Sequence, residues 1–221
     1  MLAVNYFKKL KYVIRYPEKF SEAGMYPVVI YLHGAGGRGC DISVIRNHCY
    51  FLETKKYDFN AIFIAPQCYE DSWFGIFEQI QEFGVYVSKL GYVDKERVYL
   101  MGASMGGYAV WQLAMSRPEL FAAVVPICGG GMYWNAGRLK NMSIWAFHGE
   151  NDPIVQCEES KKMVRAINRN GGHAKLTVYK ETEHNAWTST FNYKEMWSWL
   201  WGQKRNYTAE ASPYNDVKEF G

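Results

Sequence analysis

Short apolar segments recur along the chain at spacings too long for β-hairpins. They predict strands at residues 28–32, 61–65, 98–101, 122–127, 144–147 and 176–179. Segments of helical character separate most of them, at residues 42–57, 76–90, 105–115, 158–170 and 191–201. Strand and helix in alternation are typical of an α/β fold, with a mostly parallel sheet and helices on both faces. Residues 11–16 are expected to add an antiparallel strand at the edge.

The length of 221 residues suits one domain, which we place at residues 1–202. Only residues 131–142 separate two of the predicted strands, so we expect no lid domain and an open site. Residues 203–221 are polar, lack periodicity and contain Pro213. We expect them to form a mobile C-terminal tail.

Charge and cysteine usage exclude several classes of function. The 25 Lys and Arg residues and the 22 Asp and Glu residues are scattered, which predicts no nucleic-acid partner. No apolar run approaches the length of a membrane span, and the first twenty residues lack the apolar stretch of a signal peptide. The five cysteines form no CxxC pair and no closely spaced His/Cys set, so we expect reduced thiols, no metal site and a cytoplasmic protein.

The clearest chemical motif is the GxSxG sequence from Gly102 to Gly106, which follows a predicted strand and precedes a predicted helix. In this context the serine sits on a sharp, strained turn that exposes its hydroxyl, here that of Ser104. Gly102 and Gly106 provide the small residues that such a turn requires. A phosphate-binding loop is the alternative, but the chain has neither GxGxxG nor a Walker lysine at this point.

A serine nucleophile needs a base, and the base needs an acid that orients it. Asp152 and His184 each follow a predicted strand, so both are expected at the same sheet edge as Ser104. The order serine, acid, histidine is that of α/β hydrolases. Glu150 is the alternative acid, and Asp152 before Pro153 could instead be a turn former.

Acyl transfer also requires donors for a developing oxyanion. We expect one to be the amide of Met105, which follows the nucleophile. The second is expected from the glycine-rich loop after the strand at residues 28–32, at Ala35 or alternatively Gly36. His33 is expected to hold this loop by hydrogen bonds rather than to transfer protons.

Five sequence blocks resemble the small serine esterases of the α/β-hydrolase superfamily: LHGAGGRG (32–39), APQ (65–67), MGASMGGYAVWQLA (101–114), FHGENDPIV (147–155) and EHNAW (183–187). They are most similar to predicted peptidases or prolyl oligopeptidase-like esterases, with dienelactone hydrolases and the phospholipase/carboxylesterase group nearby. The resemblance covers residues 26–202. It implies ester hydrolysis without a metal or organic cofactor, with the triad at Ser104, Asp152 and His184. Prolyl oligopeptidases proper carry a propeller domain that this chain lacks, which favours an esterase over a peptidase.

Aromatic residues are abundant, at 17% of the chain, and gather in predicted loops at the same sheet edge. The candidate substrate-binding residues are Tyr69, Trp73, Phe74, Tyr133, Trp134 and Trp187. Flat aromatic walls suit an aryl acyl group or a sugar ring, so we expect esters of phenolic acids or acylated carbohydrates. The alternative is that these rings fill core space beneath the loops.

The sequence therefore predicts a serine carboxylic ester hydrolase that acts on a small-molecule ester through an acyl-enzyme. A hydrolase of small peptides or thioesters with the same triad is the first alternative. A non-catalytic binding protein of this fold is the second, although such proteins usually lose a triad member. The oligomeric state is not predicted.

Overall fold

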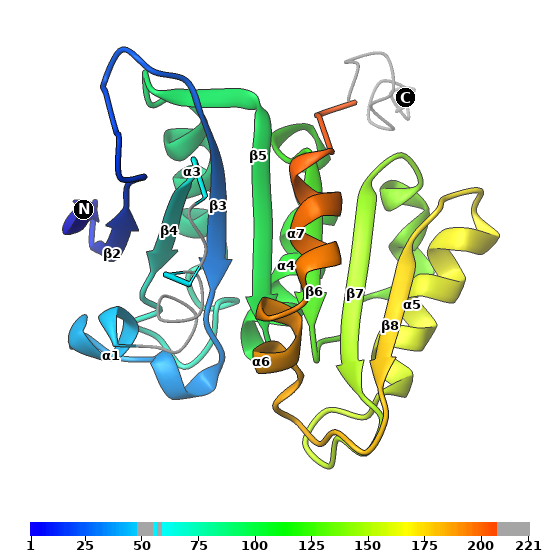
Figure 1. Ribbon diagram of the computed structural model, residues 1–221. Coiled ribbons are helices and arrows are strands. Elements are labelled where there is room, and N and C mark those ends of the chain that lie inside the picture. The colour runs from blue at the N-terminus through cyan, green and yellow to red at the C-terminus, as the bar shows by residue number, and fades with distance from the viewer. Residues whose placement is uncertain (48–54, 57–58, 207–221) are drawn as a thin grey trace, which may run out of the picture.

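A single eight-stranded sheet organises the computed structural model, which describes residues 1–47, 55–56 and 59–206. The spatial order is β1-β2-β4-β3-β5-β6-β7-β8 (Figure 1). The strands are β1 Leu2–Phe7, β2 Leu10–Arg15, β3 Tyr26–Leu32, β4 Ile62–Pro66, β5 Val93–Ala103, β6 Ala123–Ile127, β7 Ser143–Gly149 and β8 Lys175–Tyr179. The expected α/β-hydrolase architecture is confirmed.

The sheet is parallel from β4 to β8, and β1 and β2 extend it in antiparallel orientation. The antiparallel strand expected at residues 11–16 is present as β2. It is not the edge strand, because β1 pairs with it on the outer side. The hairpin between them turns at Lys8, whose φ is +53°, and Lys9. Lysines at that position carry none of the glycine or asparagine signal that marks a hairpin turn.

Helices cover both faces of the sheet (Figure 1). The α-helices are α1 Ser43–Arg46, α3 Phe77–Ser88, α4 Met105–Ser116, α5 Glu158–Arg169, α6 Ala186–Phe191 and α7 Lys194–Trp201. The 3-10 helices are η1 Ala35–Gly37, η2 Pro118–Leu120 and η3 Tyr133–Leu139. In Figure 1 α6 and α7 lie in front of the sheet, and α3, α4 and α5 lie behind it.

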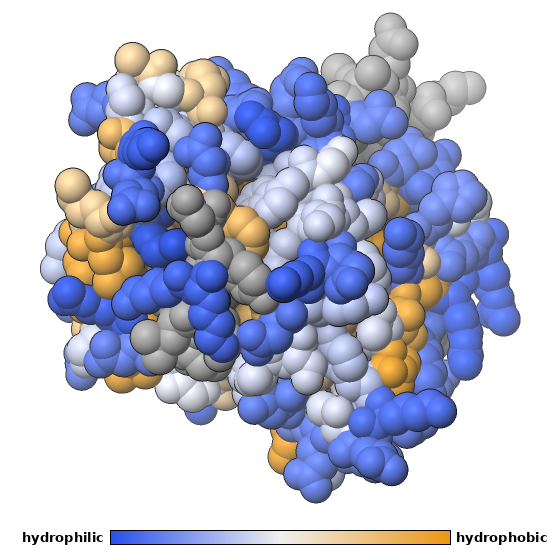
Figure 2. Space-filling view, in the orientation of Figure 1, coloured by the Kyte–Doolittle hydropathy of each residue, from blue (hydrophilic) through white to orange (hydrophobic). Residues whose placement is uncertain are grey.

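Alternate residues of the central strands supply two separate cores. Ile30 of β3 packs with α3, α4 and α5, whereas Tyr31 packs with α1, α6 and α7. Burial on both faces explains why these strands are continuous apolar runs in the sequence. The solvent-facing surface of α6 and α7 is mainly hydrophilic or of intermediate hydropathy (Figure 2).

Two predicted helices differ from the structure. Among the described residues, the helix expected at residues 42–57 is represented by α1, and Lys55 and Lys56 form a turn; residues 48–54 and 57 lie outside the described residues. The helix expected at residues 191–201 is present as α7, which begins at Lys194, and Phe191 instead ends a separate helix, α6. The sequence pattern missed α6 because it has only six residues.

The first residues after α7 are hydrogen-bonded to the body of the protein. The carbonyl of Gln203 accepts from the Tyr99 hydroxyl, and the Arg205 amide donates to the Glu96 carbonyl. The rest of the expected tail, residues 207–221, lies outside the described residues. In the part of the chain that the structure describes, no helix has the length and apolar character needed to cross a bilayer.

Candidate active site

Ser104 occupies the turn between β5 and α4 with φ +55° and ψ −118°. A positive φ strains the backbone of a residue that has a side chain, and here this conformation places the hydroxyl at the carboxyl edge of the sheet. The chain on both sides of the turn passes very close to β3. A Cβ atom at Gly102 would lie 2.6 Å from the Gly106 carbonyl oxygen, and one at Gly106 would collide with the Leu32 carbonyl. Glycine is therefore required at both positions by sterics.

His184 and Asp152 reach Ser104 from two other loops, which follow β8 and β7. His184 Nε2 lies 2.8 Å from Ser104 Oγ, and His184 Nδ1 lies 2.7 Å from Asp152 Oδ2. The carboxylate can only accept, so Nδ1 carries the hydrogen and Nε2 is free to accept the serine proton. Three residues that are distant in sequence thus form one hydrogen-bonded series.

Asp152 is held as an anion although only 6% of this residue is exposed to solvent. Burial would raise the pKa of its carboxyl, but hydrogen bonds from His184 and from the amides of Val155 and Ile154 outweigh burial and lower that pKa. Both amides donate to Oδ1 at 2.9 Å, which leaves Oδ2 for His184. The alternative acid, Glu150, has an exposed side chain, whereas Asp152 is the residue bonded to the imidazole.

The expected oxyanion donors lie on the two segments nearest the nucleophile. Met105 is the first residue of α4, so its amide has no helical partner. A Cβ atom at Gly34 would lie 3.4 Å from Ser104 Cβ, which brings the turn of η1 beside the nucleophile. Ala35 and Gly36 are exposed on this turn. Their roles remain predictions.

His33 anchors the glycine-rich loop through both ring nitrogens. Nδ1 lies 2.6 Å from the Gly34 carbonyl and therefore donates, and Nε2 accepts from the Cys68 amide at 2.9 Å. The main-chain carbonyl of His33 accepts from the Trp73 indole at 3.0 Å. These bonds agree with the expectation that His33 holds the loop.

The structure corrects the assignment of Trp73 as a substrate-binding residue. Its side chain is fully buried in the core beneath the loop, and its indole nitrogen is engaged with His33. The large ring of Trp73 fills the space beneath the loop, so it cannot form part of an open aromatic wall.

The other candidate aromatic residues are at least partly exposed. Trp187 lies edge-to-face against His184, with ring centroids 5.4 Å apart. Tyr133 and Trp134 are 48% and 74% exposed and form a T-shaped pair. Tyr69 is half-buried and donates its hydroxyl to Gln79. Phe74 is 51% exposed.

A groove of about 560 Å³ lies beside the first turns of α4. Its walls are Phe74, Phe77, Tyr108, Gln112, Gly130, Gly131 and Met132. Only Phe74 of these was expected from the sequence. Tyr108 and Gln112 follow Ser104 by four and eight residues, so they share one face of α4 with the nucleophile. That spacing is the signal that could have identified them.

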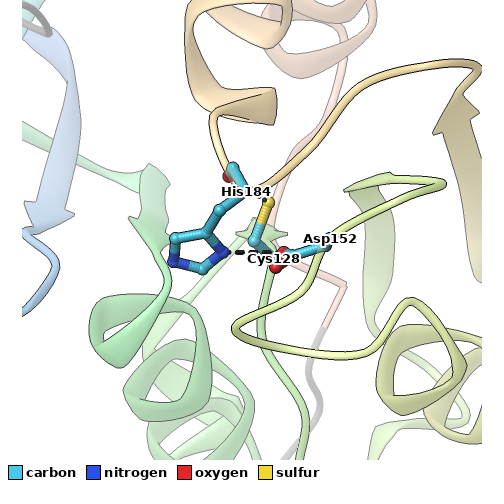
Figure 3. Close-up of side chains that lie close together, drawn as sticks. All are labelled: Cys128, Asp152 and His184. Atoms are coloured by element: carbon cyan, nitrogen blue, oxygen red, sulfur yellow. Dashed lines mark hydrogen bonds and ion pairs between the residues drawn. The ribbon is translucent and has the colours of Figure 1, made fainter.

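Cys128 lies beside the acid and the base, as Figure 3 shows. Its thiol donates to the His184 carbonyl at 3.2 Å, and burial raises its pKa to about 12. Ligand atoms of Cys128, Asp152 and His184 lie within 4.8 Å of one another, a spacing that a metal ion could use. His184 Nδ1 and Asp152 Oδ2 are already bonded to each other, so these two ligand atoms serve the hydrogen-bonded series that includes Ser104.

Comparison with known proteins identifies the family of the chain. The sequence profile of the dienelactone hydrolase family matches residues 72–220, which is more than half of the chain. The chain belongs to the dienelactone hydrolase family. The expected resemblance to esterases of the α/β-hydrolase superfamily, and the expectation of a hydrolase, are thereby confirmed.

Individual relatives are more distant. A protein named "Probable feruloyl esterase C" from Aspergillus niger is 26% identical over 83% of this chain and 70% of its own length. The protein of the same name from Aspergillus terreus is 26% identical over 73% of this chain and 62% of its own length. The crystal structure of a thermostable esterase matches with a TM-score of 0.81 and 30% identity, over 92% of this chain and 63% of that one. The chain thus spans somewhat under two thirds of two of these proteins.

Proposed function

We propose that this protein is a serine carboxylic ester hydrolase that works through Ser104, His184 and Asp152. The observation that carries the proposal is the continuous hydrogen-bonded series from Ser104 Oγ through the imidazole to Asp152 Oδ2, with distances of 2.8 Å and 2.7 Å. An imidazole in that tautomer is able to accept the serine proton, and the ionised acid stabilises the imidazolium that forms.

Catalysis then follows two half-reactions. His184 Nε2 takes the proton of Ser104, whose oxygen bonds to the ester carbonyl carbon, and the carbonyl electrons move to oxygen. The amides of Met105 and of Ala35, or alternatively Gly36, stabilise that oxyanion. Collapse breaks the bond to the alcohol oxygen, which takes the proton from His184. Water, deprotonated by His184, then bonds to the acyl carbon, and the bond from that carbon to Ser104 Oγ breaks as Oγ takes the proton back from His184 and the acid is released.

We further propose that the substrates are esters of phenolic acids or acylated carbohydrates. The groove begins one turn beyond Ser104, and its apolar walls include Phe74, Phe77 and Met132. A groove of about 560 Å³ is large enough for an aryl acyl group. The exposed pair of Tyr133 and Trp134 suits a sugar ring. The names of the Aspergillus relatives support this substrate class.

Hydrolysis by a Ser104→Ala variant tests the mechanism. We expect methyl ferulate and 4-nitrophenyl acetate to be cleaved by the native protein and turnover to fall by about 10⁴- to 10⁶-fold in the variant. Ser198→Ala, at an exposed position on α7, is the matched control and should retain full activity. Retention of most activity by Ser104→Ala would exclude the proposed nucleophile. Aminoacyl amides and thioesters in the same panel test the alternative substrates.

Removal of one ring tests the substrate class. Phe74→Ala should lower kcat/KM for methyl ferulate about tenfold relative to that for 4-nitrophenyl acetate, because only methyl ferulate has an aryl acyl group to place in the groove. Tyr6→Ala removes a ring that is 63% exposed on β1 and should leave this ratio unchanged. Equal losses on both esters in Phe74→Ala would exclude the groove as the aryl site.

The cytoplasmic location remains a prediction. It derives from the expectation of reduced thiols, and Cys40, Cys68, Cys128 and Cys157 are free in the structure. Cys49 lies outside the described residues.

A further inference from the structure

A second imidazole contacts the carboxylate of the triad. His148, on β7, is fully buried four residues before Asp152. Its Nε2 lies 2.8 Å from the Val155 carbonyl and 3.3 Å from Asp152 Oδ2, the oxygen that also binds His184. Its Nδ1 lies 2.7 Å from Ser160 Oγ on α5. One carboxylate oxygen therefore faces two histidines.

The partners of His148 determine where its hydrogen lies. The Val155 carbonyl can only accept, so Nε2 must carry a hydrogen, and the same nitrogen lies 3.3 Å from Asp152 Oδ2. Burial lowers the pKa of His148, which favours the neutral ring. In the neutral ring Nδ1 can only accept, so it competes with the Gly129 carbonyl for the one hydrogen of Ser160 Oγ. Because Ser160 Oγ also lies 2.9 Å from the Gly129 carbonyl, its hydroxyl has a second acceptor if Nδ1 becomes protonated.

We propose that His148 is a positioning residue for the triad, which orients the Asp152 carboxylate and moderates its attraction for the His184 imidazolium. This inference rests on the proposed esterase function. The two amides on Oδ1 fix one carboxylate oxygen, and Nε2 of His148, with its hydrogen, lies 3.3 Å from the other. Without that N–H, Oδ2 would direct all its hydrogen-bonding capacity to His184 and would stabilise the imidazolium more strongly.

Plotted against pH, kcat/KM should fall at low pH, where His184 becomes protonated, and we call this part of the profile the acid limb. The loss of His148 should therefore move the acid limb to higher pH. We expect a displacement of about half a pH unit, which corresponds to the lower end of the range for the net free energy of a single hydrogen bond. Turnover should also fall about 10- to 100-fold, by analogy with the effect of removing a hydrogen-bond partner that orients a metal-binding side chain. A residue that only supports the fold would lower activity in proportion to the loss of folded protein and would leave the limb in place.

The surrounding charges are the same in every variant of the comparison. Other titratable groups that bear on Asp152 or its neighbours are Cys128, Cys157, Tyr108, Glu150 and Glu159. Burial raises the pKa of both thiols and of the Tyr108 phenol, so these three groups stay neutral through the acid limb. A displacement of the limb in a His148 variant can then be assigned to that residue.

The test compares His148→Leu with His148→Gln in the full chain, with methyl ferulate and 4-nitrophenyl acetate as substrates. Leucine removes the N–H and should displace the acid limb upward, whereas glutamine, whose amide reaches the Nε2 position, should restore the native limb. His173→Leu, at an exposed position, is the matched control and should not move it. An unmoved limb in His148→Leu, or a displacement to lower pH, would overturn the proposal.

Proton NMR of the imidazole rings separates this inference from the esterase proposal. In the unmutated protein we expect a protected hydrogen on Nε2 of His148 and none on its Nδ1 near neutral pH. The resonance of the His184 hydrogen on Nδ1, which is bonded to Asp152 Oδ2, should shift in His148→Leu even if no ester is hydrolysed. Absence of the Nε2 hydrogen would refute the role of His148 without any variant, whereas failure of the native protein to cleave esters would refute only the esterase function.

Discussion

Asp152→Asn tests the electrostatic logic of the triad with a change of very few atoms. Oδ1 of Asp152 accepts two main-chain amides at 2.9 Å, so the oxygen of an asparagine side chain must occupy that position. Its amide nitrogen then takes the place of Oδ2, 2.7 Å from His184 Nδ1. Two donors cannot face each other, so the imidazole must shift its hydrogen to Nε2, where it can no longer accept the proton of Ser104.

The expected loss is about 10⁴-fold in kcat, the scale found when a triad acid is replaced by its amide. That factor corresponds to about 5.5 kcal/mol of transition-state stabilisation. Steady-state hydrolysis of 4-nitrophenyl acetate measures it, with thermal unfolding to confirm that the variant is folded. Glu150→Gln is the matched control, since this exposed side chain is the alternative acid, and it should retain native activity.

Two results would refute the reasoning. Retention of more than a tenth of native turnover by Asp152→Asn would show that the tautomer of His184 does not depend on the acid. A large loss in Glu150→Gln would show that the acid is elsewhere in the loop.

Three further predictions concern stability and the site. Gly106→Ala should lower the melting temperature markedly, because its Cβ would collide with the Leu32 carbonyl, whereas Ala at Gly36, with open space around it, should be tolerated. The pKa of Asp152 is lowered in the folded protein, so its ionised form stabilises the fold at pH values above the unfolded-state pKa of about 3.9. This contribution is lost as the pH falls through the pKa of the folded state. The free energy of unfolding in urea should therefore depend less on pH below 5 in Asp152→Asn than in the native protein. Cys128→Ser should keep most of the esterase activity because a hydroxyl can also donate to the His184 carbonyl, and Cys128→Ala should lose more activity. Equal activity in the two variants would show that this hydrogen bond does not contribute to catalysis.

The sequence predicted those features that repeat or that local sterics impose. The parallel strands are continuous apolar runs because they are buried on both faces, and such runs are visible without coordinates. Gly102 and Gly106 mark the turn at Ser104 because no side chain fits against β3. Asp152 and His184 were predictable because parallel strands place the loops that follow them at one edge.

Features that depend on the packing of distant segments were not predictable. Trp73 is followed by Phe74 in the same loop, yet one ring is buried under His33 and the other faces solvent. The contact between His148 and Asp152 depends on how the loop after β7 folds back, and no residue pattern encodes that. The β1 strand was missed because its hairpin turns at two lysines.

Capture of the acyl-enzyme tests the central claim most directly. The protein is mixed with excess 4-nitrophenyl acetate, quenched in acid within milliseconds, digested and analysed by mass spectrometry. We predict a burst of 4-nitrophenol and the mass of one acetyl group on the peptide that contains Ser104, with neither in Ser104→Ala. Acetylation of a different residue in step with turnover, or steady hydrolysis without a burst or an adduct at Ser104, would contradict the account.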